Sequence, residues 1–135
     1  MKASTLSFRT AVLLGLVGMA WGITMGISHD HSTMPAHAHL NLLGWVSLFL
    51  FGVYYRLHPA TDVGRLALAQ IATWALGTVV MTVGVAAIHA GHEGADPIAA
   101  IGSLIVVGSM LLFATLVFRP AGDHAGAPRM LAPAE

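Results

Sequence analysis

The chain has 135 residues, of which 56% are hydrophobic and only 9% charged, and its mean hydropathy is +0.77. A soluble domain carries roughly a quarter charged residues, so the expected surroundings are membrane lipid rather than water. The formal net charge of zero argues against a nucleic-acid partner, and the lack of cysteine excludes disulfides and thiolate metal sites.

Four apolar segments follow one another along the chain, and each is long enough to cross a bilayer core of roughly 30 Å as a helix. They cover residues 8–27, 36–57, 65–90 and 98–118. The connections between them are short, which makes consecutive helices antiparallel. The sequence therefore predicts an all-α fold in which one domain, residues 1–119, forms an integral membrane four-helix up-down bundle.

The first apolar segment shares features with a secretory signal peptide, because Lys2 and Arg9 flank the start of an apolar run. That run is longer than the apolar core of a typical signal peptide, and "GISHDHS" is a poor cleavage site. We therefore expect the segment to stay in the protein as a membrane helix.

Basic side chains gather at one end of the predicted bundle, which indicates that this end faces the cytoplasm. They are Lys2, Arg9, Arg56, Arg65, Arg119 and Arg129. Both termini are then cytoplasmic, and we expect a multi-pass protein of the bacterial inner (cytoplasmic) membrane. Tyr54 and Tyr55 fall where an interfacial aromatic belt is expected. The tail, residues 120–135, is rich in Pro, Ala and Gly and is predicted to be disordered.

The opposite, outer end carries six of the eight histidines: His29, His31, His37, His39, His89 and His92. Residues i and i+2 of a helix are separated by about 200° around its axis, so the rings of His37 and His39 should face different neighbours. An imidazole at the edge of the hydrocarbon is costly unless it is paired or coordinated, and is a functional candidate. The alternative is that both rings are hydrated at the headgroup level and have no role.

The stretch "HAHLNLLGWVSLFLFGVYYRLHP", residues 37–59, resembles the haem-ligating tenth helix of subunit I of haem–copper oxidases, particularly the C-type oxidases and their nitric oxide reductase relatives. The shared pattern is His-x-His, Leu-Gly-Trp-Val at 43–46, Gly52, Tyr54-Tyr55 and Pro59. It covers about a sixth of the chain. Elsewhere the likeness is one of hydropathy alone.

The resemblance implies that a b-type haem binds near the outer face, since in that family the first histidine of the pair binds the high-spin haem and the second the low-spin haem. His37 and His39 become candidate axial ligands. Asn41 and Gly44 share the stripe of His37, and Trp45 matches the family pattern, so these three are candidates to line the cofactor. Subunit I has twelve helices in three four-helix arcs, and this chain resembles one arc. Three copies would rebuild the ring, which implies a homo-oligomer and suggests a trimer.

The chain also departs from the family, because the other segments lack the three further histidines of the oxidase copper site and carry no Asp or Glu within the hydrocarbon. We therefore do not expect complete oxygen reduction from this chain and assign no catalytic residue. The candidate functions that remain are electron transfer and the binding of a gas such as O2 or NO. Bis-histidine ligation would favour electron transfer because it leaves no open position on iron. The sequence does not identify an electron donor.

A second axial ligand has two candidate sources. His89 ends the third segment on the same side of the membrane as His39, although it is equally well interpreted as a cap of the helix end. The other source is His37 or His39 of a neighbouring protomer.

Two other functions stay open. The outer connections concentrate imidazoles, acidic groups and a thioether, which suits copper or zinc. A metal-transporting or metal-delivering protein would then use His29, His31, His37, His39, His89 and His92 as ligands. The third possibility is a structural helper subunit that binds neither haem nor metal.

Glycines recur on three of the segments. Gly18, Gly22 and Gly26 are spaced by four residues, which permits tight helix contact or leaves a flat wall for a planar macrocycle. Two further rows are interpreted as packing seams, one formed by Gly77 and Gly84 and the other by Gly102 and Ser109.

Overall fold

The computed structural model describes residues 1–92 and 94–118, so the predicted disordered tail lies outside the described residues. Its elements are α1 (Ala3–Ser28), α2 (Met34–His39), the π-helix η1 (Leu40–Ser47), α3 (Leu48–Leu57), α4 (Pro59–Asp62), α5 (Arg65–His89) and α6 (Asp96–Val117). Because α2, η1 and α3 are continuous, four helices are long and apolar enough to cross a membrane. The predicted all-α, four-helix membrane fold is confirmed.

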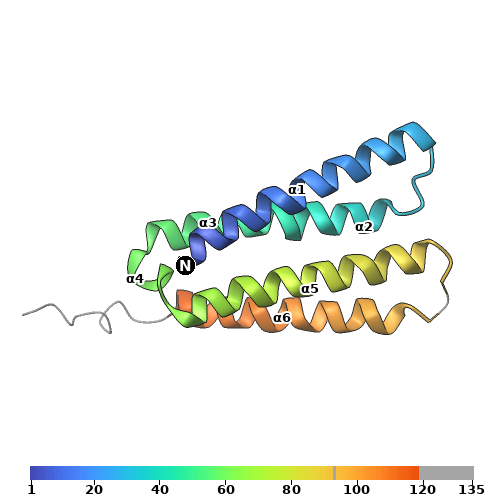
Figure 1. Cartoon of the computed structure of the whole chain (residues 1–135). Helices are drawn as coiled ribbons and strands as arrows, with labels where there is room; N and C mark the ends of the chain where they lie inside the picture. Colours follow the sequence, from blue (N-terminus) through green and yellow to red (C-terminus); the bar gives the residue numbers. More distant parts are fainter. Residues whose placement is uncertain (93, 119–135) are drawn as a thin grey trace, which may run out of the picture.

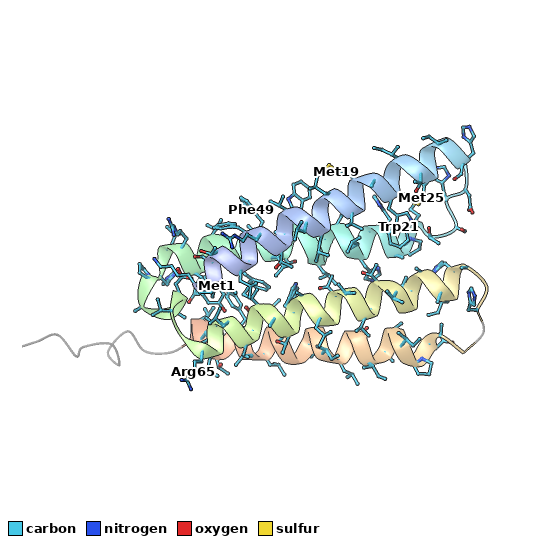
Figure 2. The ribbon with its side chains drawn as sticks, in the orientation of Figure 1. Met1, Met19, Trp21, Met25, Phe49 and Arg65 are labelled. Carbon is cyan, nitrogen blue, oxygen red and sulfur yellow. The ribbon has the colours of Figure 1, made fainter. Side chains whose placement is uncertain are left out.

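The four helices run up and down beside one another (Figure 1). α1 lies antiparallel to the continuous helix α2–η1–α3, which in turn contacts α5, and α6 packs mainly on α5. Large apolar side chains such as Met19 and Phe49 project from the outside of the bundle, where lipid would surround them (Figure 2). Met1 and Arg65 lie at the same end, in agreement with the gathering of basic residues predicted there.

α1 begins at Ala3, five residues before the predicted start, because polar contacts hold its first turn. The backbone N–H of Ser4 donates to Asp62 Oδ1 at 2.7 Å, and Ser4 Oγ donates to Asp62 Oδ2 at 2.8 Å. Asp62 ends the short helix α4 and is buried. The carboxylate satisfies the N–H of Ser4, one of the groups of the first turn that have no partner within the helix. Hydropathy alone does not report such a contact.

The middle of the second membrane helix is wound as a π-helix, η1. The buried residues of this helix include a row at every fourth position: Ala36, Leu40, Gly44, Leu48 and Gly52. In a regular α-helix each step of four residues would rotate the row by about 40°, or about 160° over the whole row. The wider turns of η1 offset this rotation, so the row stays on one face. Trp74 Nε1 donates to the carbonyl of Leu43 at 2.9 Å and satisfies a carbonyl within this segment.

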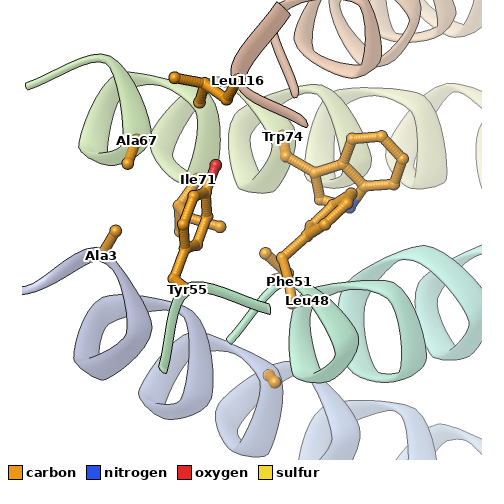
Figure 3. Close-up of a cluster of buried hydrophobic side chains, with 9 residues drawn as sticks. Ala3, Leu48, Phe51, Tyr55, Ala67, Ile71, Trp74 and Leu116 are labelled. Carbon is orange, nitrogen blue, oxygen red and sulfur yellow. The ribbon is translucent and has the colours of Figure 1, made fainter. Parts of the chain in front are cut away.

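The apolar core lies where α1, α3 and α5 meet, with Leu116 added from α6 (Figure 3). Phe51 and Trp74 meet edge to face with their ring centroids 4.8 Å apart. Tyr55 is fully buried, and its hydroxyl donates to Gln70 Oε1 at 3.0 Å. Tyr55 therefore points into the bundle rather than toward the lipid, and Gln70 supplies the polar partner that its hydroxyl needs there.

The seam between α5 and α6 brings the two backbones close together. A methyl group placed on Gly84 would meet the backbone of Ala99, and one placed on Gly102 would meet the backbone of Met81. Ser109 Oγ donates to the carbonyl of Gln70 at 2.8 Å. The predicted packing seams of α5 and α6 are confirmed, since only glycine permits this approach.

Candidate cofactor site

The side of the second membrane helix that carries His37 is closed by α1. A methyl group placed on Gly22 would lie 3.0 Å from His37 Cε1, and one placed on Gly18 would meet the side-chain amide of Asn41. Asn41 Nδ2 donates to the carbonyl of His37 at 2.9 Å. The packing interpretation is confirmed for Gly18 and Gly22. The side chains of Asn41 and His37 cover the glycine surface against which a flat macrocycle would have to lie.

Further along the same seam, Trp45 and Gly44 also face α1. A methyl group placed on Gly15 would lie 3.2 Å from Trp45 Cγ, and one on Gly44 would lie 3.0 Å from Leu14 Cδ1. By contrast, outside its own helix no described atom lies within 4 Å of a methyl group placed on Gly26. The side of the second membrane helix that faces α1 thus carries His37, Asn41, Gly44 and Trp45. This agrees with the predicted stripe of His37, Asn41 and Gly44.

The ring of His39 is held by its own helix. Its Nδ1 lies 2.7 Å from the carbonyl oxygen of Pro35, one turn earlier. Because a carbonyl can only accept, Nδ1 is the donor in this contact, and in the neutral ring Nε2 is then the nitrogen with the free lone pair. In metal-ligating histidines, likewise, the ring nitrogen that does not bind the metal donates its proton to a backbone carbonyl or a carboxylate.

His39 lines an open groove of about 380 Å³. Its lining comes from the second membrane helix and from α5 and α6. The lining residues are Ala38, His39, Leu42, Leu43, Met81, Ser103, Val106 and Val107. Most of them are aliphatic, and the volume falls within the range of about 300–1,000 Å³ typical of small-molecule sites. His37 and His39 therefore face different neighbours, as their spacing predicts.

His89 resembles His39 in one respect, because its Nδ1 lies 2.9 Å from the carbonyl oxygen of Val85. It is exposed at the end of α5 and does not belong to the lining of the groove. The structure therefore does not bring His89 and His39 together in one cavity, which agrees with the interpretation of His89 as a residue of the helix end.

The remaining outer histidines are exposed. His29 ends α1 in the left-handed conformation, with φ 53°, and His31 follows in the connection to α2. Between them, Asp30 Oδ1 accepts the backbone N–H of Ser32 at 2.9 Å, which lowers the pKa of this carboxyl below its ordinary value. In the part of the chain that the structure describes, no three His, Asp or Glu side chains converge to hold a metal ion.

The connection between α1 and α2 is fixed by a tryptophan. Trp21 Nε1 donates to Thr33 Oγ1 at 3.1 Å, and this hydroxyl lies 3.7 Å from Met25 Sδ. Trp21 and Met25 both lie in the half of α1 nearer this connection (Figure 2). The contact anchors the residue that directly precedes α2, and with it the start of the helix that carries both histidines.

Sequence reasoning did not assign Met81 and Ser103 to the site. Ser103 Oγ lies 3.2 Å from Met81 Sδ and 2.9 Å from the carbonyl oxygen of Ala99. No local pattern distinguishes Met81 from the other methionines, because its place in the same groove as His39 depends on how α5 and α6 pack beside the second membrane helix.

No protein-family model, no curated protein and no solved structure matches this chain. Any assignment of function therefore depends on the site itself and on the resemblance of residues 37–59.

Proposed function

We propose that this chain is a membrane-bound b-type haem protein in which His39 supplies an axial ligand to the iron. The observation that carries the proposal is the hydrogen bond between His39 Nδ1 and the Pro35 carbonyl, which leaves Nε2 able to coordinate a metal at the edge of an apolar groove. The resemblance of residues 37–59 to a haem-ligating helix supports the same ligand.

The residues present fit this cofactor. A haem is a flat, largely apolar macrocycle, and the groove offers aliphatic walls with one imidazole among the described residues of its lining. When bound, the haem would supply reversible one-electron chemistry at iron. The chain's own contribution would be to hold the imidazole of His39 in place and to shield the cofactor from water with aliphatic side chains such as Leu42, Leu43 and Val106.

His37 is the less favoured ligand in this proposal. Its ring lies against Gly22 in the closed seam with α1, so a macrocycle could reach it only after α1 moved away. His39 needs no such movement. The function proposed is electron transfer or the binding of O2 or NO, and not the complete reduction of oxygen.

The test is a visible spectrum of the full-length protein, purified in mild detergent with haem supplied during expression. We expect a Soret band and a sharp α-band after reduction. His39→Ala should lose most of the Soret absorbance, whereas His37→Ala, on the same helix, should keep it. His31→Ala, an exposed histidine of the α1–α2 connection, is the control for general effects of losing an imidazole.

A colourless preparation that contains stoichiometric copper or zinc would overturn the proposal and favour the metal-binding alternative. Absorbance that survives His39→Ala but is lost in His37→Ala would overturn the assignment of the ligand.

A further inference from the structure

Arg9 stands on the side of α1 that faces away from the other helices. Its side chain is exposed, and so are Leu13 and Leu16, which follow four and seven residues later on the same face. The buried residues of α1, which include Ser7 and Ala11, lie on the other side of the helix. In a membrane, Arg9 is therefore directed at lipid, with two aliphatic side chains beside it toward the middle of the helix.

Arg9 also lies within the expected hydrocarbon layer. α1 has 26 residues, or about 39 Å of helix, so a centred helix extends only about 4–5 Å beyond each edge of a bilayer core of roughly 30 Å. Arg9 comes about 9 Å along the axis after Ala3, the first helical residue. Its backbone is then roughly 4 Å inside the hydrocarbon. Arg65 differs, because it is the first residue of α5 and lies at the end of the bundle (Figure 2).

No carboxylate among the described residues is placed to pair with Arg9. Asp30 and Asp96 belong to the other end of the bundle. Asp62 is buried, and its two oxygens accept hydrogen bonds from the backbone N–H and the hydroxyl of Ser4. A charged side chain inside the membrane is costly unless it is paired. The partner of Arg9 therefore comes from outside the described part of the chain, and the anion that a bilayer offers is lipid phosphate.

The guanidinium of Arg9 is able to reach the headgroup layer. Side chains of an α-helix tilt toward its N-terminus, and a long arginine stem lets the charged group extend to the interface. Lys2 directly precedes α1 and is exposed, and its spacing of seven residues from Arg9 brings it close to the same face. Arginine pairs with phosphate through two hydrogen bonds, and lysine adds a second positive charge. Two such charges favour a headgroup of net negative charge over a zwitterionic one.

We propose that Arg9 and Lys2 bind the phosphate of one anionic phospholipid, and that Leu13 and Leu16 contact its acyl chain. The site lies on the outer face of α1, away from the groove of His39, so it does not depend on the proposed haem function. The bound lipid compensates the charge of Arg9 and sets the depth of α1 in the membrane.

The experiment titrates the full-length protein in mild detergent with short-chain phosphatidylglycerol and phosphatidylcholine, and counts bound lipids by native mass spectrometry. We expect wild type to bind phosphatidylglycerol about tenfold more tightly than phosphatidylcholine. Arg9→Gln should remove most of this preference, and Lys2→Gln should weaken binding of phosphatidylglycerol by about fivefold. Arg65→Gln, which removes the same charge at the same end of the bundle, is the matched control and should keep the preference.

Equal affinity of wild type for the two lipids would overturn the proposal, and this comparison decides the question even if Arg9→Gln is not recovered in folded form. Equal losses in Arg9→Gln and Arg65→Gln would also overturn it, because they would indicate diffuse attraction by the whole basic end. Excess inorganic phosphate tests the source of the anion. It should leave phosphatidylglycerol bound, and displacement of the lipid would contradict a contribution from the acyl chain.

Discussion

The seam between α1 and the second membrane helix and the seam between α5 and α6 are both lined by glycines, yet these glycines make room for different groups. Gly18 and Gly22 of α1 accommodate the side chains of Asn41 and His37, whereas Gly84 and Gly102 accommodate backbone atoms of the facing helix. A side chain can rotate away from an added methyl group, but a backbone cannot. The first seam is therefore adaptable and the second rigid, and the groove of His39 has the rigid pair as one of its walls.

The largest expected effect in this comparison comes from Gly102→Ala. The new methyl group would collide with the backbone of Met81 and separate α5 from α6, which should lower the free energy of unfolding by about 1–3 kcal/mol. Gly108→Ala is the control, because outside its own helix no described atom lies within 4 Å of a methyl group at that position. It should be neutral or stabilising by up to about 1 kcal/mol, since alanine is the better helix former. Reversible unfolding in mixed detergent measures both, and equal stability of the two variants would contradict a rigid seam.

A smaller effect is expected from Gly18→Ala in the adaptable seam. The methyl group would meet the amide of Asn41, which can turn aside at the expense of its hydrogen bond to the His37 carbonyl. The gain in helix propensity offsets part of this loss, so the net change in the free energy of unfolding should stay below about 1 kcal/mol. Gly26→Ala has the same gain without the collision and is the matched control. A loss from Gly18→Ala as large as that from Gly102→Ala would remove the distinction between the two seams.

The smallest effect concerns the connection that closes the adaptable seam. Hydrogen bonding to the backbone N–H of Ser32 lowers the pKa of Asp30 from its ordinary value of 3.8. Because the pKa in the folded protein is the lower one, the contribution of Asp30 to stability is complete above its ordinary value and is lost as the pH falls through the folded value. Asp30 is fully exposed, so the change should be slight. Thermal unfolding at about pH 5 and at about pH 3 should show a difference in wild type that Asp30→Asn lacks; the same pH dependence in both would exclude Asp30 as its source.

The number, order and antiparallel arrangement of the four long helices were predictable because they depend on local composition and short connections. Long apolar runs joined by short connections leave few other arrangements for a chain in lipid. The divergence of His37 and His39 was predictable for a similar reason, since it follows from helix geometry alone. The early start of α1 was not, because the carboxylate that stabilises it, Asp62, lies 58 residues away from Ser4 in the sequence.

Only part of the candidate site was predictable from the sequence. The sequence alone determined a four-helix membrane protein with imidazoles at one end, because apolar length and helical period are properties of neighbouring residues. Only the tertiary structure decided that α1 closes over His37, that His39 lines an open groove, and that Met81 and Ser103 line the same groove. These outcomes depend on which faces of distant helices meet, and in this chain glycine backbones and a π-helical turn determine those faces.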